Sequence, residues 1–363
     1  MPFSKIKRAL EKSYNKPLEN IFKSFDPRPL ASATIAQVHL AEVEGISGKV
    51  VVKVRRPGIK KIINRELSIL RSLVKDPGVF KLLDSLETVI REEIDLTVES
   101  KYLKKGQIYQ DKKRGIRVVK EITEYPAKEN ILIMELANGA SIRKYLDRTE
   151  LIKKSKSLRR LYEKWLKEAL FGSGFFHADL HAGNLFFNLQ TEKPGYELTL
   201  IDFGSVGVLT FEERKALIQL GLGIYMQKPE LIVTGFRPFE HMSCQDAKSF
   251  YRKIKKIIKN NKGQLNDQTT LVVNEAIKRE FNISKNYLQF NRGKVFIEEH
   301  IRINNERLDQ EGLQGHISEP SDIYVNVLLR KIPRIIKNLV FQKDSKHKSI
   351  IDKYANDVIH LAG

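Results

Sequence analysis

The pattern of hydrophobic and polar positions changes along the chain, from strand-like segments to helical ones. Four segments read as strands: residues 35–43, 49–55, 116–119 and 131–135. The second contains Val50-Val51-Val52-Lys53-Val54, a run of β-branched residues that is typical of a buried strand. Residues 44–48 join it to the first, and Pro57-Gly58 ends it.

Hydrophobic residues at helical intervals predict helices over residues 4–12, 18–25, 59–74, 79–104, 142–146 and 158–173. Asn138-Gly139 separates the strands from a mostly helical second half. We therefore predict an α+β chain of two lobes, one small and rich in strands, one larger and mainly helical. The expected ranges are a helical lead-in (1–28), the small lobe with a helical insertion (29–137) and the large lobe with a helical C-terminal extension (138–363).

Composition excludes few classes of function. The 363 residues, 41% of them hydrophobic, suffice for a core, and Cys244 as the single cysteine suits a reducing compartment. No signal peptide or membrane-spanning stretch is apparent, so we expect a cytoplasmic chain, at most peripheral to a membrane. The net charge of +20 could attract an anionic membrane surface, or could simply be solvated lysine. We expect no nucleic acid as partner, since the sequence lacks zinc-ligand and aromatic RNA-binding signatures.

Six residues near the middle of the chain carry the chemistry. His177, Asp179 and Asn184 form a His-x-Asp-x4-Asn motif, and Asp202-Phe203-Gly204 follows. Asp179 can orient an attacking hydroxyl, while Asn184 and Asp202 offer oxygen ligands for Mg²⁺ beside the phosphates of ATP. We expect His177 and Phe203 to support this loop by packing, and Gly204 to let the backbone turn Asp202 inward. The motif predicts a protein-kinase-like fold.

The same chemistry needs a lysine on a small-lobe strand and a carboxylate to hold it. Lys53 fits the first role. If residues 92–99 are helical, Glu92, Asp95 and Glu99 share one face, with Glu93 aside. The alternative is a surface stripe paired with nearby cations, and at this point it stays open.

Ahead of Lys53, where many kinases have a glycine-rich loop, this chain has alanines and hydroxyl residues. We assign nucleotide binding to this loop: Ala31, Ser32, Ala33, Thr34, Ile35 and Ala36. Alanine keeps phosphate farther from the backbone than glycine does, so we expect a stiffer loop in which amides and the hydroxyls of Ser32 and Thr34 donate to phosphates. Glu135, in the predicted linker between the lobes, is also assigned to the nucleotide.

Three segments together resemble the UbiB/AarF/ADCK family of atypical kinases: Pro-Leu-Ala-Ser-Ala-Thr-Ile-Ala-Gln-Val-His at 29–39, Glu-Ile-Asp-Leu-x-x-Glu at 93–99 and Phe-Phe-His-Ala-Asp-Leu-His-Ala-Gly-Asn at 175–184. The resemblance implies that Lys53 contacts nucleotide and pairs with Glu99, and that Glu93 and Asp95 form the family's Glu-x-Asp element. It also implies Mg²⁺-dependent use of ATP in support of ubiquinone or other isoprenoid-lipid metabolism, with isoprenoid-lipid enzymes as partners.

The sequence departs from the family pattern in three ways. No hydrophobic C-terminal anchor is apparent, so we expect any association with a membrane to use a basic or amphipathic surface. The Lys-x-Gly-Gln extension usual in the family is missing, so we expect either a shortened variant or a truncated gene start. Leu180 and Ala182 replace two prolines of the catalytic motif. Two other functions stay open: a small-molecule phosphotransferase resembling aminoglycoside or choline kinases, and a nucleotide-binding pseudokinase scaffold.

Overall fold

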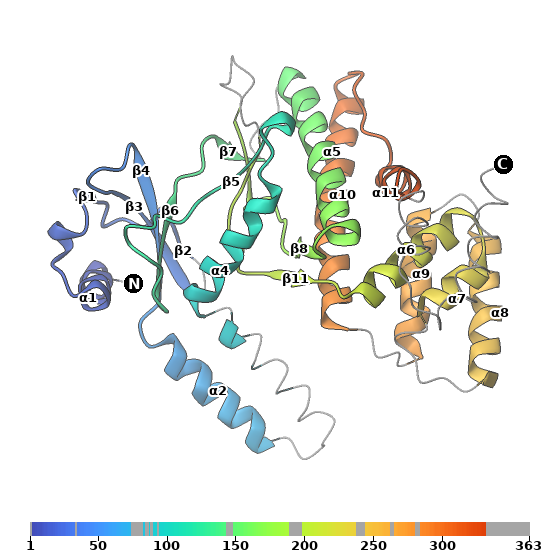
Figure 1. Ribbon diagram of the computed structural model, residues 1–363, viewed down its shortest axis with the longest axis horizontal. Coiled ribbons are helices and arrows are strands. Elements are labelled where there is room, and N and C mark those ends of the chain that lie inside the picture. The colour runs from blue at the N-terminus through green and yellow to red at the C-terminus, as the bar shows by residue number, and fades with distance from the viewer. Residues whose placement is uncertain are drawn as a thin grey trace, which may run out of the picture. The chain divides into compact units, whose positions relative to one another are not determined.

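The fold is described from a computed structural model (Figure 1). The structure describes residues 2–331 apart from residues 33–34, 74–82, 84–86, 88–89, 93, 143–147, 189–197, 237–243, 262–264 and 280–283. Within these residues, no helix is long and apolar enough to cross a membrane. They form two compact units, and the predicted domain ranges stay predictions. The first unit is drawn from Met1–Leu158, His177–Val206 and Arg292–Gln314, and the second from Arg159–Phe176, Gly207–Asn291 and Gly315–Gly363.

The first unit contains an antiparallel sheet in the order β1-β3-β4-β6, with β2 paired to β3. Its strands are β1 (Ser24–Phe25), β2 (Ala31–Ser32), β3 (Ala36–Glu42), β4 (Lys49–Arg55) and β6 (Ile131–Glu135). The strands predicted from β-branched content are confirmed, and for β4 and β6 the bounds agree as well. Val38 lies opposite Lys53 and Lys53 lies opposite Leu132, so these three side chains share one face of the sheet.

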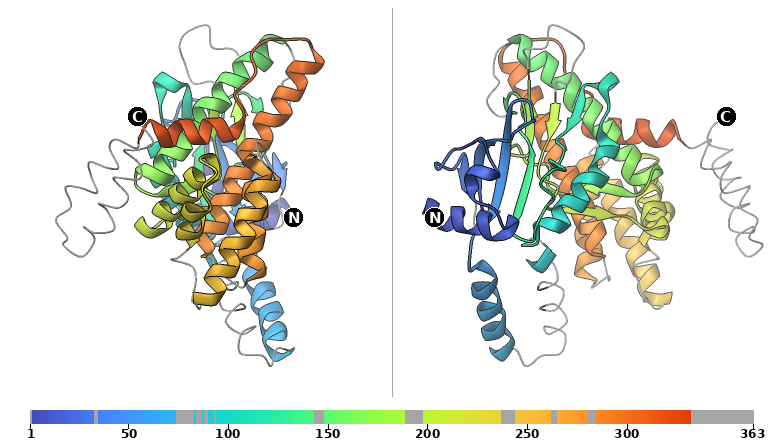
Figure 2. Two further views of the ribbon diagram at one scale, coloured as in Figure 1. Left: turned by 90° about the vertical axis from the view of Figure 1, so that its right-hand side faces the viewer. Right: turned by 60° about the vertical axis from the view of Figure 1, so that its left-hand side comes forward.

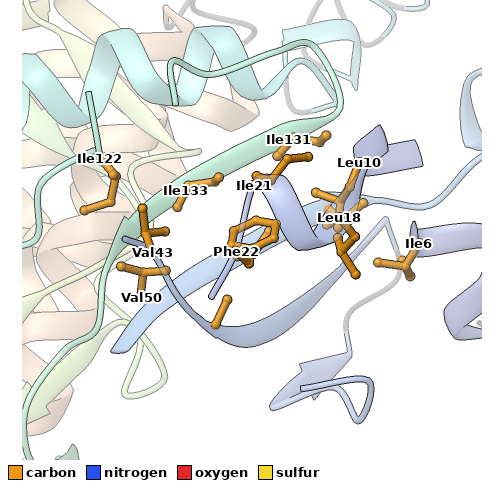
Figure 3. Close-up of a cluster of buried hydrophobic side chains, with 13 residues drawn as sticks. Ile6, Leu10, Leu18, Ile21, Phe22, Val43, Val50, Ile122, Ile131 and Ile133 are labelled. Carbon is orange, nitrogen blue, oxygen red and sulfur yellow. The ribbon is translucent and has the colours of Figure 1, made fainter. Parts of the chain in front are cut away.

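The other face of the sheet carries the core of this region (Figure 3). Val50, Val52 and Val54 alternate with Lys53 along β4 and pack with Ile6 and Leu10 of helix α1, Phe3–Tyr14. Ile6, Leu10, Val52 and Val54 are completely buried. Burial of this side fixes the register of β4, because a slip by one residue would turn Lys53 into the core.

The helix predicted over residues 18–25 is wrong. A 3₁₀ turn, Leu18–Asn20, is followed by β1. The N–H of Lys23 donates to the carbonyl of Glu42 at 2.8 Å, and the N–H of Asp26 donates to the carbonyl of Leu40 at 2.8 Å. Pairing with β3 therefore satisfies this backbone and overrides the helical spacing of its hydrophobic residues.

Two helices connect the strands of this sheet. Helix α2 (Ile59–Leu73) follows β4 and extends away from the sheet, as both views of Figure 2 show. Helix α4 (Leu96–Gly106) begins directly after Asp95, whose carboxylate accepts from the Thr97 N–H at 2.9 Å. The prediction of one helix running unbroken through residues 79–104 is therefore wrong at Asp95, because this side chain caps a new helix. Glu92, Asp95 and Glu99 do not share one helical face.

A second sheet, in the order β5-β10-β9-β7, positions the catalytic motif. Its strands are β5 (Ile116–Val118), β7 (Ala140–Ser141), β9 (Leu185–Phe187) and β10 (Leu198–Leu200). Leu185 lies opposite Leu200, and the Ile201 N–H donates to the Asn184 carbonyl at 3.1 Å. Asn184 and Asp202 thus leave the same end of one strand pair. The helix predicted over 142–146 lies outside the described residues except for Ile142, which forms a turn.

Two long helices, α5 (Arg148–Phe171) and α10 (Lys285–Gln310), contribute residues to both units. The helix predicted over 158–173 is part of α5, which begins earlier. Two short strands, β8 (Phe175–His177) and β11 (Val206–Val208), pair where the chain passes from one unit to the other.

The other elements that the structure describes in the second unit are helices. Its further helices are α6 (Phe211–Tyr225), α7 (Pro229–Phe236), α8 (Cys244–Asn260), α9 (Leu265–Lys278) and α11 (Pro320–Leu329). Its core includes Trp165, which stacks on Phe290 with ring centroids 4.7 Å apart and meets Phe176 edge-on. The predicted order, strands first and helices afterwards, is confirmed.

Candidate functional site

Lys53 lies at the centre of a charged cluster in the first unit. Its Nζ donates to both carboxylate oxygens of Glu99 at 2.8 Å and to Oδ2 of Asp202 at 3.1 Å. Glu99 lies on the first turn of α4 and its side chain is only 6% exposed, whereas the side chain of Asp202 is 40% exposed. One lysine therefore links the small-lobe sheet, α4 and the Asp-Phe-Gly motif.

The electrostatics of the cluster follow from its burial. Burial by itself would lower the pKa of Lys53, but the charges of Asp202 and Glu99 outweigh it and raise this pKa. Burial and the charge of Asp202 raise the pKa of Glu99 to about 7, against the effect of Lys53. Burial would raise the pKa of Asp202, yet Lys53 and the Gly204 N–H lower it to about 2. At neutral pH, Lys53 and Asp202 are therefore fully charged.

Strand β4 also fixes the start of α4. Arg55 lies two residues beyond Lys53, on the same face of β4, and its Nη1 donates to the Ile94 carbonyl at 2.7 Å. The following residue, Asp95, caps α4. The same strand thus holds both the lysine and the helix that carries its carboxylate partner. Of the predicted Glu-x-Asp element, Asp95 acts as the cap and Glu93 lies outside the described residues.

The catalytic loop is held by hydrogen bonds between its own members. The Asp179 N–H donates to Nδ1 of His177 at 3.1 Å, and Nδ2 of Asn184 donates to the Asp179 carbonyl at 2.9 Å. Since Nδ1 accepts, Nε2 carries the ring proton and faces the Ile201 carbonyl at 3.4 Å. Burial lowers the pKa of His177. The buried, neutral imidazole supports the loop, and the Asp179 carboxylate remains for the reaction.

Asp202 adopts a left-handed backbone conformation, with φ of 55°. Its Oδ1 accepts from the Gly204 N–H at 3.1 Å, the kind of local bond that lets aspartate occupy this region. The conformational freedom expected of Gly204 is therefore found at Asp202 instead. Gly204 supplies space, because a β-carbon there would lie 3.1 Å from Oδ1 of Asp202.

Phe203 is completely buried, with its ring centroid 4.7 Å from that of His177. The ring also lies against Gly106, the last residue of α4, where a β-carbon would overlap the Phe203 ring. Gly106 was not identified from the sequence, since a lone glycine at a helix end usually marks a cap. It couples α4 sterically to the Asp-Phe-Gly segment.

The alanine-rich loop is partly described: Ala31 and Ser32 form β2, Ile35 and Ala36 lead into β3, and Ala33 and Thr34 lie outside the described residues. The Ser32 hydroxyl accepts from Nη2 of Arg56 at 2.9 Å. The Arg56 N–H also donates to the Ile35 carbonyl at 2.8 Å. Arg56 therefore ties both sides of the loop to the end of β4, and the expected stiffness of the loop stays a prediction.

The side chain of Glu135 accepts hydrogen bonds from neighbouring residues of the first unit. Its Oε2 accepts from Nη2 of Arg117 at 2.9 Å and from the Lys120 N–H at 3.0 Å. Its own N–H donates to the Lys120 carbonyl at 2.8 Å. The predicted role of Glu135 in nucleotide binding stays a prediction, and its described contacts tie β6 to the segment after β5.

Helix α10 brings a residue to the site that sequence analysis missed. Nη2 of Arg292 lies 2.8 Å from Oδ1 of Asp179. Arg292 is 113 positions beyond Asp179, outside every motif, and the only available signal was the spacing of four residues from Arg292 to Phe296 and from Phe296 to His300.

The oxygen donors at the site fit Mg²⁺. Nδ2 of Asn184 is bonded to the Asp179 carbonyl, and Oδ1 of Asn184 accepts no hydrogen bond from the described residues. The carboxylate of Asp202 is partly exposed. No cluster of three or more His, Cys, Asp or Glu residues suited to a metal exists in the described chain. Mg²⁺ commonly binds one or two side-chain oxygens and fills its shell with water and phosphate, so these two donors suffice.

Comparisons with known proteins identify the family of the chain. Similar proteins include a probable protein kinase UbiB of Marinobacter nauticus, 30% identical over 231 residues, which are 60% of this chain and 41% of that protein. Protein ACTIVITY OF BC1 COMPLEX KINASE 8, chloroplastic, of Arabidopsis thaliana is 29% identical over 239 residues, 62% of this chain and 30% of that protein. The chain thus spans less than half the length of both relatives.

A solved structure, the complex of Rv3197 with erythromycin from Mycobacterium tuberculosis, has a TM-score of 0.49 and 22% sequence identity over 70% of this chain and 66% of that one. A family model described as the ABC1 atypical kinase-like domain matches residues 1–234. The resemblance read from three motifs and the two-lobe kinase-like fold are thereby confirmed. Because that match covers more than half of the 363 residues, the chain belongs to the ABC1 atypical kinase-like domain family.

Proposed function

We propose that this chain is an ATP-dependent kinase or ATPase that holds Mg²⁺ and ATP beside the Lys53 cluster. The observation that carries the proposal is the position of Lys53 Nζ, within 2.8 Å of Glu99 and 3.1 Å of Asp202. A buried lysine held by two carboxylates retains its charge and presents it at a fixed point, as neutralisation of the inner phosphates requires. Asn184 and Asp202 would hold the metal, which would neutralise charge on the phosphates.

Asp179 is proposed to orient the attacking oxygen of a hydroxyl or of water. That oxygen forms a bond to the γ-phosphorus, while the bond from this phosphorus to the β–γ bridging oxygen breaks and ADP leaves with the electron pair. The proton of the attacking group passes to Asp179 and from there to solvent. His177 and Phe203 keep the loop in place.

The biological setting rests on the family. Names of relatives and the three shared motifs support a role of the UbiB type, beside ubiquinone or other isoprenoid-lipid metabolism. The net charge of +20 supports an anionic membrane surface as a partner.

The test measures the melting temperature of the full chain with ATP, with and without Mg²⁺, for the unchanged protein and for Lys53→Ala, Lys53→Met and Asp202→Asn. Ligand at 100 times its Kd stabilises a native protein by about 2.7 kcal/mol. We expect Lys53 variants to lose much of the ATP effect and Asp202→Asn to lose the Mg²⁺-dependent part. Lys60→Ala is the matched control, because Lys60 is an exposed lysine that pairs with Glu129.

Two results would count against the proposal. Stabilisation by ATP that stays the same in the Lys53 and Asp202 variants would show that nucleotide binds elsewhere. If the stabilisation by ATP depends on both residues but no ADP is released, the chain is a nucleotide-binding scaffold and not an enzyme.

A further inference from the structure

One face of helix α10 lies against the catalytic loop. At intervals of four residues, Arg292 bonds Asp179, the Phe296 ring lies 6.3 Å from that of His181, and Nε2 of His300 lies 3.0 Å from the Leu180 carbonyl. Such spacing places the three side chains on a single helical face. These three side chains contact three consecutive loop residues, Asp179 to His181. This face of α10 therefore packs along the part of the loop that carries Asp179.

The helix is anchored farther along. Nδ2 of Asn304, which is completely buried, donates to Oγ of Ser155 at 2.6 Å and to the Leu151 carbonyl at 3.2 Å. Both acceptors belong to α5. Together with His300, these bonds hold this part of α10 in a fixed position, so Arg292 approaches Asp179 from a rigid element.

Arg292 still has free hydrogen-bonding capacity. Its side chain is 52% exposed, and its guanidinium lies 5.7 Å from the centroid of the Phe296 ring. Of its five N–H donors, one on Nη2 bonds Oδ1 of Asp179, and the others meet no acceptor among the described residues. A guanidinium that is oriented by an aromatic ring and open on one side is suited to bind the planar edge of an oxyanion.

Arg292 is also the one cation within bonding distance of Asp179 that is charged at every working pH, as far as the described residues extend. His181 approaches the other carboxylate oxygen, but only to 4.0 Å, and it is charged only when protonated. Lys53 is occupied by Glu99 and Asp202. Phosphoryl transfer spreads negative charge over three phosphoryl oxygens, so the acceptor side of the site needs a further positive charge.

We propose that Arg292 is a catalytic residue that binds the phosphoryl group during its transfer, and this inference rests on the proposed function. The attacking oxygen must lie within about 2.6–3.2 Å of Asp179 to give up its proton. The γ-phosphorus lies in line with that oxygen, so the guanidinium beside Asp179 can donate from its unused edge to the phosphoryl oxygens. It binds these oxygens while the bond to the acceptor forms and the bond to the ADP oxygen breaks.

The residue comes from outside the part of the chain that the family model matches, residues 1–234. On this proposal the helical segment after the matched domain completes the active site. Removal of α10 would therefore remove catalysis even though Lys53, Asp179, Asn184 and Asp202 remained.

The test measures Mg²⁺-dependent release of phosphate from ATP by the full chain and by Arg292→Ala, Arg292→Gln and Arg292→Lys. An arginine that stabilises a transferred phosphoryl group contributes about 10³–10⁵ to kcat, so we expect kcat to fall at least about 100-fold in the Ala and Gln variants. Arg292→Lys should retain part of the rate. Stabilisation by ADP with Mg²⁺ should be unchanged in all three, because the nucleotide is held by other residues.

Chemical rescue separates a catalytic role from a structural one. Guanidinium ion, at concentrations far below those that unfold the protein, should raise kcat of Arg292→Ala, and the same concentration of sodium chloride should not. Arg302→Ala is the matched control, since Arg302 is an exposed arginine of α10 that pairs with Glu306. Its kcat should equal that of the unchanged chain.

Three outcomes would overturn the inference alone and leave the proposed function in place. A kcat of Arg292→Ala equal to that of the unchanged chain would exclude a catalytic role. A higher kcat would mean that the ion pair restrains Asp179, and a lower kcat without rescue, together with a lower melting temperature, would mean that Arg292 serves the fold. Absence of hydrolysis by the unchanged chain would instead overturn the proposed function, and the inference with it.

Discussion

At the scale of single residues, the site depends on charges that burial makes strong. In the cluster of Lys53, Glu99 and Asp202, both carboxylates raise the pKa of Lys53, and Lys53 lowers the pKa of each carboxylate against the effect of burial. Substitution of Lys53 therefore leaves two neighbouring carboxylates without their cation, which costs more than the lost contacts alone. For this reason we include Lys53→Met beside Lys53→Ala, because methionine fills the space of the aliphatic stem.

A second buried lysine gives a prediction about pH. Lys154 on α5 is only 4% exposed, and burial together with the charge of Arg307 lowers its pKa from 10.5 to about 8. Between these two pH values the unfolded chain binds the proton and the folded chain does not, so the free energy of unfolding rises with pH. The shift corresponds to about 3 kcal/mol.

We expect Lys154→Met to raise the free energy of unfolding at pH 7 by about 1–3 kcal/mol, because it removes a buried charge and keeps the volume. It should also abolish the rise between pH 8 and 10.5, measured by urea unfolding. Lys153→Met is the control, since Lys153 is the exposed neighbour on the same helix. A gain no larger than that of the control would contradict the prediction.

The sequence was sufficient to select the candidate residues that lie within motifs. Lys53, Asp179, Asn184 and Asp202 were selected because phosphoryl transfer fixes the residue types and their spacing, and Glu99 by resemblance. Arg292 could not be found this way. Its position follows from the packing of α10 on the catalytic loop, which no local pattern encodes.

At the scale of elements, α4 connects the two halves of the site. It carries Glu99 on its first turn and ends at Gly106 against the ring of Phe203. A shift of this helix would therefore move the partner of Lys53 and the Asp-Phe-Gly segment together.

Gly106→Ala tests this coupling. A β-carbon at Gly106 would overlap the buried Phe203 ring, and overpacking of this kind costs about 1–3 kcal/mol. We expect a lower melting temperature and weaker stabilisation by ATP with Mg²⁺, because Asp202 precedes the displaced ring. Phe203→Leu combined with Gly106→Ala should recover part of the loss. Losses that simply add in the double variant would show that the two residues are independent.

The prediction of strand bounds was correct where a segment is rich in aliphatic residues and also buried in the core. The bounds of β4 and β6 agree with the sequence pattern because both strands are rich in aliphatic residues and central to the core. Residues 18–25 were misread because their helical spacing is outweighed by backbone pairing with β3, a strand that lies later in the chain. The helix over 79–104 was drawn too long, since a capping aspartate within an otherwise helical pattern looks like any other surface residue.

At the scale of the whole molecule, neither compact unit is a continuous piece of the chain. The chain passes between them five times, at residues 158/159, 176/177, 206/207, 291/292 and 314/315. The segment His177–Val206, which contains the catalytic loop, belongs to the first unit and is preceded and followed in sequence by parts of the second. A fragment ending with the family match would therefore lack Arg292–Gln314 from the first unit, which is why every experiment above uses the full chain.

The charge of the molecule leads to a prediction about its partner surface. Exposed cations crowd onto α8: Lys248, Arg252, Lys253, Lys255, Lys256 and Lys259. With a net charge of +20, the chain should bind vesicles that contain anionic lipid and dissociate as salt is added. Vesicles of neutral lipid should not bind. Sedimentation with vesicles measures both.

A pair of matched variants locates the contact. Lys255→Glu with Lys256→Glu should weaken vesicle binding more than Lys112→Glu with Lys113→Glu, although both double variants remove the same charge from exposed sites. Equal weakening would mean that only total charge matters. Binding to neutral vesicles as strong as to anionic ones would contradict an electrostatic surface altogether.

The contact of α1 with the small-lobe sheet has a consequence for synthesis on the ribosome. Ile6 and Leu10 emerge before most of their core, which includes Ile131 and Ile133 of β6, and Ser13 bonds Asn130 across 117 positions. The helix therefore has no complete partner surface until more than a hundred further residues have been translated. During that interval its apolar side stays available to chaperones, so the sheet that presents Lys53 closes late, after most of the small lobe has left the exit tunnel.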